Sequence, residues 1–295
     1  MTQKSQKIFL TMRTVKCCTK NRIKNKIIGP MRQELCESEF YQLYFKPNLE
    51  KCLRLLEDRQ IEQMICYGLG SFMTGFGIVA SRYQLALILL IHEELLKNSC
   101  PLSTDIEIYD PLFEDEDVDV LTSFSCPKFK LIEQNEHCAR KISTTDDNRC
   151  ALVFMPHMDN GFYNNLLGAN WDANSLSKLV ILGNDFKLLC DDPLFAKQLK
   201  VRFQYVSRLV NNFSDYEKKK RKRQKKTGSN IETSEVHIKK ALIRLLIVDD
   251  DDPYYFGGSF SSMAFHLVDN SWLKENARKI EQSRIKDWKC EIIRY

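Results

Sequence analysis

The sequence contains no C-x-x-C pair, and its 11 cysteines are odd in number and irregularly spaced. Without a recognisable secretory signal at the N-terminus, this pattern indicates reduced thiols rather than a disulfide framework. None of the five histidines lies at zinc-ligand spacing from a cysteine. We therefore expect no metal site in this protein.

Long apolar runs are also missing. The longest one, residues 85–91, is far shorter than the roughly 20 residues that cross a bilayer, so we expect no membrane span. Only 11 glycines and 8 prolines are present, which excludes a collagen-like or low-complexity chain. With 43% hydrophobic and 28% charged residues, the 295-residue chain has the composition of a globular protein with a sizeable core.

Acidic residues are absent from two segments that carry much of the positive charge. Residues 1–32 contain nine basic residues and no acid, and the run from Lys218 to Lys226 (KKKRKRQKK) contains eight more. Without these seventeen residues, the formal net charge of +5 becomes about −12. Because an acidic body repels phosphates, we do not expect the folded part to bind nucleic acid.

The two basic segments are expected to lie outside the packed fold. Residues 1–33 are predicted to be a disordered tail, with a mitochondrial presequence as the alternative, because residues 8–15 are mildly amphipathic. Residues 214–239 are predicted to be a lysine-rich disordered insertion. Within it, the run from Lys218 to Lys226 is predicted to bind a nuclear import receptor, and the alternative is a solvated loop.

Between these segments the apolar periodicity alternates between strand and helix. Residues 34–60 are predicted to be a helical segment that precedes an α/β domain made of residues 61–213 and 240–295. The expected strands are 61–67, 105–109, 128–133, 151–155, 179–182, 242–248 and 261–268, and the expected helices of the domain include 79–97, 114–124 and 186–199. Nearly continuous apolar strands in strand–helix–strand units predict a Rossmann-like three-layer α/β sandwich with a mostly parallel sheet.

Polar and glycine residues follow several of the expected strands. They are Gly68, Gly70, Ser71, Asp110, His157, Asn184 and Asp249. Ligands of open α/β sheets bind beyond the carboxyl ends of the strands, so we expect Gly68, Gly70, Asp110, His157 and Asn184 to line one pocket. Glycines there allow the backbone to approach a phosphate or ribose, and an acid after the second strand suits ribose hydroxyls. The candidate cofactors are therefore S-adenosylmethionine or a nucleotide.

Each of these residues also has a purely structural interpretation. Met73 stands where a G-x-G-x-x-G fingerprint needs its last glycine, so the glycines equally predict a tight turn without a ligand. His157 could act as a general base or could bind a neighbouring loop. No catalytic triad, nucleophile elbow or P-loop can be assigned. A nearby group of polar residues predicts a network that holds loops together: Asn164, Asn165, Asn170 and Trp171.

Six blocks of sequence occur in order between about residues 60 and 186. They read CYGLGSF at 66–72, RYQLA at 82–86, YDPLF at 109–113, FMPH at 154–157, YNNLL with NW at 163–171, and ILGNDF at 181–186. Together with FSSMAFH at 260–266, they resemble the Sensitivity-to-Red-light-Reduced (SRR-like) domain family. In addition to the residues at the strand ends, the blocks contain further motif residues: Arg82, Gln84, Tyr163, Asn164, Asn165, Asn170, Trp171 and His266.

The chain departs from the family pattern at four positions. These are Met158 in place of Cys, Asp185 in place of Ser, Asp117 in place of Glu and Ser125 in place of Gly. The resemblance implies a regulatory protein of the cytoplasm and nucleus, linked to circadian-clock input, clock gene expression and regulation of heme biosynthesis, with no defined reaction. The competing hypothesis is a small-molecule-binding enzyme on the same fold, in the first place an S-adenosylmethionine-dependent methyltransferase.

Overall fold

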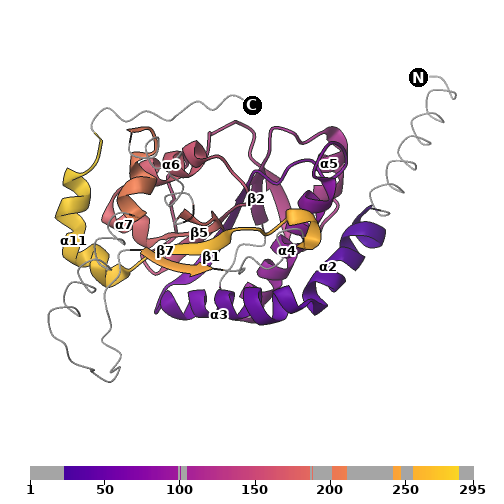
Figure 1. Cartoon of the computed structure of the whole chain (residues 1–295), viewed down its shortest axis with the longest axis horizontal. Helices are drawn as coiled ribbons and strands as arrows, with labels where there is room; N and C mark the ends of the chain where they lie inside the picture. Colours follow the sequence, from indigo (N-terminus) through magenta and orange to yellow (C-terminus); the bar gives the residue numbers. More distant parts are fainter. Residues whose placement is uncertain are drawn as a thin grey trace.

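The computed structural model describes residues 23–98, 100, 105–186, 188, 201–210, 242–246 and 255–285. At its centre is a seven-stranded sheet in the order β3-β2-β1-β4-β5-β7-β6 (Figure 1). The strands are β1 (Gln60–Tyr67), β2 (Asp105–Tyr109), β3 (Lys128–Leu131), β4 (Arg149–Met155), β5 (Leu179–Asn184), β6 (Leu242–Leu246) and β7 (Met263–Val268). β1 to β5 are parallel, whereas β7 pairs antiparallel with both β5 and β6. The prediction of a mostly parallel, Rossmann-like sheet is confirmed.

Burial along the strands follows their place in the sheet. In β4, every residue from Cys150 to Met155 is buried, and all of β7 is buried as well, because helices cover both faces of the central strands. The outer strand β3 instead exposes Lys128 and Lys130. Lysines on an edge strand oppose pairing with another chain, so this edge of the sheet is protected.

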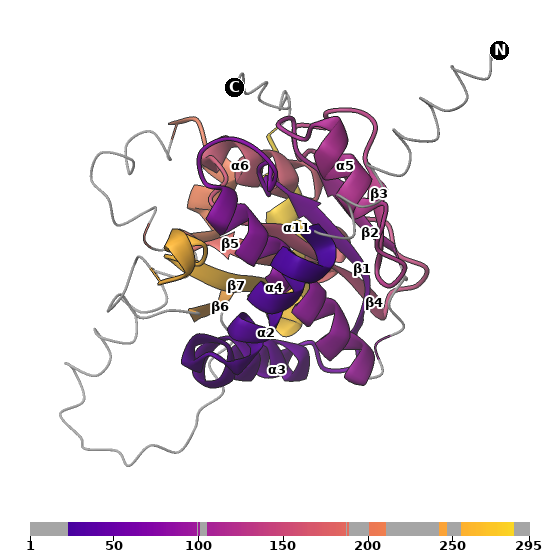
Figure 2. The same ribbon diagram turned by 90° about the vertical axis from the view of Figure 1, so that its right-hand side faces the viewer.

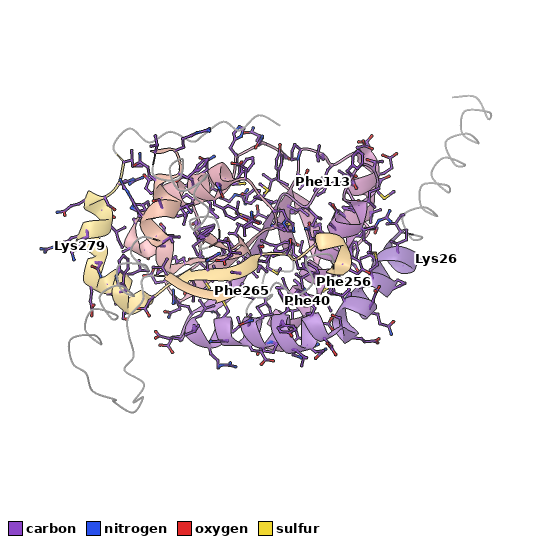
Figure 3. The ribbon with its side chains drawn as sticks, in the orientation of Figure 1. Lys26, Phe40, Phe113, Phe256, Phe265 and Lys279 are labelled. Atoms are coloured by element: carbon purple, nitrogen blue, oxygen red, sulfur yellow. The ribbon has the colours of Figure 1, made fainter. Side chains whose placement is uncertain are left out.

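One face of the sheet is covered by the N-terminal helices and the first crossover helices. These are η1 (Lys24–Ile28), α2 (Gly29–Glu37), η2 (Phe40–Phe45), α3 (Lys46–Leu55), α4 (Ile78–Lys97) and α5 (Asp115–Leu121). Proline stands in the first turn of both α2 and α3, where its missing N–H costs no hydrogen bond. The short helix η3 (Tyr255–Gly258) adds Phe256 to this layer beside Phe40, with ring centroids 6.0 Å apart (Figure 3). α4 is buried around most of its surface because α2 lies next to it (Figure 2), and η1 and η3 pack against it as well.

The other face is covered by α6 (Asn160–Ala169), α7 (Ala173–Ser177), a helical stretch at residues 204–210, and α11 (Asn270–Gln282). In Figure 1, α6 and α7 lie on the side of the sheet opposite α2 and α3. α6, α7 and α11 each begin after an aspartate whose side chain accepts a backbone N–H: Asp159, Asp172 and Asp269. Such N-caps stabilise a helix start by about 1 kcal/mol.

Three differences separate the structure from the sequence-based expectations. The predicted tail of residues 1–33 is too long, because η1 and α2 begin at Lys24 and Gly29 and bury Ile28 against the core. α11 was not expected, although Asp269 before an amphipathic stretch is a signal for it. β5 continues through Gly183 and Asn184 rather than ending before them.

Other expectations concern residues that lie outside the described ones. They are the insertion at 214–239 with the run from Lys218 to Lys226, Asp249, and most of the helix expected at 186–199. No helix in the described part of the chain is long and apolar enough to span a bilayer.

Asn170 offers a test of this architecture, because its fully buried side chain joins two segments. Its Oδ1 accepts the Ile142 N–H at 2.8 Å, and its Nδ2 donates to the carbonyls of Arg140 (2.9 Å) and Leu166 (2.8 Å). Asn170→Ala leaves these backbone groups without their partner, so we expect the free energy of unfolding to fall by about 1–3 kcal/mol in urea denaturation.

The matched control is Asn174→Ala, since the Asn174 side chain is exposed. It should leave the denaturation midpoint within about 0.5 kcal/mol of the wild type. Equal stability of the two variants would contradict a structural role for Asn170.

Candidate functional site

The predicted site residues lie where the parallel strands end. Gly68 follows β1, Asp110 follows β2, His157 follows β4, and Asn184 is the last residue of β5. Parallel neighbours point the same way, so all of these positions share the carboxyl edge of the sheet. Their role in binding a ligand stays a prediction, and their contacts show what each does in the fold.

The turn after β1 depends on glycine. Gly68 and Gly70 have φ values of 74° and 75°, in the left-handed region that other residues avoid. A Cβ on Gly68 would lie 1.9 Å from the Met158 Sδ, and a Cβ on Gly70 would lie 2.8 Å from the Ser81 Oγ. The Met158 side chain therefore occupies the space directly against the first glycine.

Asp110 joins the turn after β1 to the turn after β2. Its Oδ2 accepts the Gly70 N–H at 2.7 Å and its Oδ1 accepts the Leu112 N–H at 2.8 Å. Burial raises the pKa of Asp110 above its ordinary value, and the nearby Asp117 raises it further, while the two backbone N–H groups act in the opposite direction. Each carboxylate oxygen keeps a second lone pair that could accept a ligand hydroxyl.

Asp117 also joins the turn after β1 to a later segment, through Phe72, two residues after Gly70. It is fully buried in the first turn of α5, where Oδ1 accepts the Phe72 N–H at 3.0 Å and Oδ2 accepts the Glu114 N–H at 3.0 Å. The second bond belongs to a capping box of Glu114 and Asp117. We did not assign this role to Asp117 from the sequence, although an acid three residues after Glu114 at a helix start is the signal for it.

Ser71 and Arg82 complete the turn from its two sides. The Ser71 Oγ accepts the N–H groups of Met73 (3.2 Å) and Thr74 (3.0 Å), which closes a local hydroxyl turn. The Arg82 Nε donates to the Phe72 carbonyl at 2.9 Å, and burial lowers the pKa of its guanidinium. The loop is thus held by side chains of three elements.

His157 is exposed and has a positive φ of 53°. Its Nε2 lies 3.0 Å from the Ser259 carbonyl oxygen, which also accepts the Gln84 Nε2–H at 3.2 Å. Because a carbonyl can only accept, His157 must carry its proton on Nε2 in this contact. The structure thus shows that His157 binds a neighbouring loop. If it also acted as a general base, Nδ1 would have to accept the proton.

Asn184 is the meeting point of three motif segments. Its backbone N–H donates to the Tyr163 Oη at 2.8 Å, its Nδ2 donates to the Met158 carbonyl at 3.0 Å, and its own carbonyl accepts the His266 Nε2–H at 2.9 Å. The Tyr163 Oη in turn donates to the Met155 carbonyl, and burial raises the pKa of this phenol. The Asn184 Oδ1 is buried and has no hydrogen-bond partner among the described residues.

The polar residues of α6 also bind neighbouring segments, as the sequence predicts. The Asn164 Oδ1 accepts the Tyr205 N–H at 2.9 Å, and the Asn165 Nδ2 donates to the His137 carbonyl at 3.0 Å. Just beyond the helix, the Trp171 Nε1 donates to the Ser283 Oγ at 2.9 Å. Together with Asn170, these residues connect α6 to segments on three sides.

The segment after β3 carries a feature that sequence reasoning missed. His137 and Cys138 are consecutive non-glycine residues with positive φ values of 47° and 59°. Such backbone strain costs of order 1–3 kcal/mol per residue and must be held by its surroundings, here including the bond from Asn165. The His137 Nδ1 is buried without a hydrogen-bond partner among the described residues. Two adjacent strained residues leave no signal in the sequence.

Hollows at the amino edge of the sheet contain none of the predicted site residues. Two open ones have volumes of about 430 and 450 Å³ and share Glu57 and Arg59 in their walls. The buried Arg59 guanidinium donates to the carbonyls of Leu56 and Ser177, so it connects β1 to α7. Within the described ranges, no three His, Cys, Asp or Glu side chains are grouped so as to hold a metal ion.

Comparisons with known proteins agree with the motif blocks. The model of the SRR1 domain family matches residues 45–267. The chain is 35% identical to the SRR1-like protein of Mus musculus over 150 residues, which are 51% of this chain and 54% of that protein. It is 28% identical to the Arabidopsis thaliana Protein SENSITIVITY TO RED LIGHT REDUCED 1 over 167 residues, which are 55% of each chain.

A third relative is the SRR1-like protein of Drosophila melanogaster, 24% identical over 163 residues, which are 54% of this chain and 51% of that protein. The chain therefore spans about half the length of the curated relatives that it matches. No solved structure matches the chain.

The contacts of Asp110 predict a stability effect that needs no ligand. In Asp110→Asn one of the two backbone N–H groups loses its acceptor, because the amide nitrogen can only donate. We expect the free energy of unfolding at pH 7 to fall by about 1–3 kcal/mol, measured by chemical denaturation. Asp58→Asn, which changes an exposed carboxylate, is the control and should have no measurable effect.

The raised pKa of Asp110 also predicts how the stability difference between the wild type and Asp110→Asn depends on pH. The folded protein binds this proton more tightly than the unfolded chain, so lowering the pH from neutral through the folded-state pKa adds stability to the wild type. Asp110→Asn cannot titrate, so the gap between wild type and variant should widen as the pH falls toward about 4. A variant as stable as the wild type at pH 7 would contradict the structural role.

Proposed function

Because the chain belongs to the SRR1 domain family, we propose that it is a regulatory protein rather than an enzyme with a defined reaction. Its regulatory role is proposed to lie in circadian-clock input, clock gene expression and the control of heme biosynthesis. One relative's name refers to sensitivity to red light, which is compatible with input from light to such a system.

The observation that carries this proposal is that the polar motif residues make hydrogen bonds within the fold. Asp110, His157 and Asn184 each bond backbone groups of another segment, and so do Tyr163 and Asn170. Most of these residues thus hold the loops at the carboxyl edge of the sheet, and Asn170 holds the end of α6. Polar groups that are already bonded within the fold suit a surface that partners recognise, since a catalytic group must be free to reach a substrate.

A regulator of gene expression needs access to the nucleus. We propose that the run from Lys218 to Lys226 binds an import receptor and that the protein is distributed between cytoplasm and nucleus. Nine consecutive residues with eight positive charges cannot be buried without partners, which supports an accessible signal.

The experiment uses cells that lack the protein and carry a clock-gene reporter. Re-expression of the full chain should restore both the reporter rhythm and the heme content. A chain in which residues 218–226 are replaced by an equal length of Ser and Gly should stay out of the nucleus and fail to restore the rhythm.

Its outcomes separate the two parts of the proposal. Cells that keep normal rhythm and heme content without the protein would contradict the regulatory role. Unchanged nuclear signal after replacement of the run would contradict import through it and leave the regulatory role standing.

A second candidate function is favoured by one observation, the strand order. By analogy of fold alone, β3-β2-β1-β4-β5-β7-β6 with an antiparallel β7 is the sheet on which many S-adenosylmethionine-dependent methyltransferases are built. We propose that the carboxyl edge binds S-adenosylmethionine or a nucleotide. Free lone pairs on Asp110 and the buried, unpartnered Oδ1 of Asn184 would accept hydroxyl or amine groups of such a ligand.

The contacts of Gly68 set a condition on this second function. The Met158 sulfur lies where a ligand would approach the glycine backbone, so the Met158 side chain must move before a nucleoside can enter. Met158→Ala clears this space and is expected to strengthen binding.

A thermal-shift screen tests ligand binding directly. The purified chain is heated with S-adenosylmethionine, NAD, nucleotides or heme, and a ligand at 100 times its dissociation constant should add about 2.7 kcal/mol of stability. We expect a shift with S-adenosylmethionine or a nucleotide that grows in Met158→Ala and disappears in Asp110→Asn. No shift with any of them in either wild type or Met158→Ala would exclude the second function.

A further inference from the structure

The loop between β1 and α4 presents an aromatic side chain to solvent. Phe76 is fully exposed, and it stands between Gly75 and Gly77, which both have positive φ values. A Cβ at either glycine would meet nothing within 4 Å, so the tip of the loop projects away from the rest of the described structure. An exposed phenylalanine costs solvation free energy in the isolated protein, which raises the question of what covers it.

The base of the same loop is firmly held. Backbone N–H groups of Gly70 and Phe72 donate to the carboxylates of Asp110 and Asp117, and Arg82 donates to the Phe72 carbonyl. Phe76 therefore lies only four residues after Phe72, whose backbone is held on both its N–H and its carbonyl. Interfaces use aromatic side chains presented from a preorganised backbone as anchors, because little conformational entropy is lost when they bind.

Two more exposed aliphatic side chains come from segments joined to this loop. Leu112, in the turn after β2, is 60% exposed, and Val79, in the first turn of α4, is 51% exposed. Phe113, next to Leu112, is labelled in Figure 3. Its ring centroid lies 6.0 Å from that of Phe72. We call Phe76, Val79 and Leu112 together the Phe76 surface. The contacts of Gly70 with Asp110 and of Phe72 with Phe113 join the segments that carry them, beyond the carboxyl ends of β1 and β2.

The exposed charge beside this surface is acidic. The exposed residues Glu114, Asp115 and Glu116 follow directly after Phe113 at the start of α5. No basic residue occurs between residues 105 and 127, and residues 68–81 carry no charge. The basic residue that follows them, Arg82, is half-buried and donates to the Phe72 carbonyl. A partner for this region must therefore combine apolar side chains with positive charge.

We propose that the Phe76 surface binds a basic amphipathic helix or peptide of a partner protein, with Phe76 as the anchor and the acids of α5 opposite its Lys or Arg residues. The surface is built from side chains other than those of the proposed ligand site at Asp110, so the inference holds whether or not a small molecule binds there. Acidic residues disfavour the anionic lipid surfaces that attract other exposed apolar loops, which makes a protein partner the better fit.

The test measures binding of a defined probe to the full chain by fluorescence anisotropy. The probe is a labelled peptide of leucine and lysine, about 18 residues or five helical turns long, with all leucines on one face. Wild type should bind it, with an affinity that weakens as salt is added. A peptide of the same composition in scrambled order, and one with Glu in place of Lys, should bind at least about tenfold more weakly.

Variants then locate the contact. Phe76→Ser and Leu112→Ser should each weaken probe binding about tenfold or more without changing the melting temperature, because both side chains are exposed. Glu116→Lys should weaken it as well. The matched control is Leu43→Ser on η2, an equally exposed leucine elsewhere on the molecule, which should bind like the wild type.

Three results would overturn the proposal. They are failure of the wild type to bind the amphipathic probe, equal binding of the scrambled peptide, and loss of binding in Leu43→Ser equal to that in Phe76→Ser. Phosphatidylcholine vesicles serve as a further probe in a sedimentation assay. If the chain binds them through Phe76 as strongly as it binds the peptide, the surface is a membrane contact and the inference is wrong.

Discussion

In the turn after β1, the Gly68 N–H still donates to the Tyr109 carbonyl at the end of β2, but the N–H groups of Gly70 and Phe72 lie beyond the strands, because the chain leaves the sheet through two glycines before α4 begins. Carboxylates from the next crossover supply the acceptors: Asp110 binds Gly70, and Asp117 binds Phe72. Both acids are buried, so backbone donors rather than water satisfy their carboxylate oxygens. The loops after β1 and β2 thereby become one unit, and the positions of Phe76, Leu112 and α5 all depend on it.

The architecture was largely predictable because a strand that is buried on both faces of a sheet consists of a short, nearly continuous run of apolar residues. β1, β2, β4 and β5 were expected close to their observed bounds, and the carboxyl-edge positions of Gly68, Asp110, His157 and Asn184 followed from the parallel order. The antiparallel pairing of β7 could not be seen in this way, since a buried strand has the same apolar pattern in either direction.

The site was harder to predict than the fold, because the type of a residue does not reveal whether its polar group already makes hydrogen bonds within the protein. Asp110 suits a ribose by chemistry, yet its oxygens accept two backbone N–H groups, and His157 bonds a carbonyl 102 residues further along the chain. The obstruction of Gly68 by Met158 and the strained pair His137 and Cys138 arise from tertiary packing alone. No local pattern in the sequence encodes such contacts.

The place of β7 has a consequence for how the chain folds. β7 lies between β5 and β6, and among the described strands β6 has no other partner. Until residues 263–268 have been synthesised, β6 is therefore unpaired and β5 is paired on its β4 side alone. During translation, β1 to β5 can pair as they emerge, but the free edge of β5 stays open while the following segments are made. An open apolar edge is where nascent chains associate wrongly, so the sheet is most exposed to misassociation in the interval between the synthesis of β5 and that of β7.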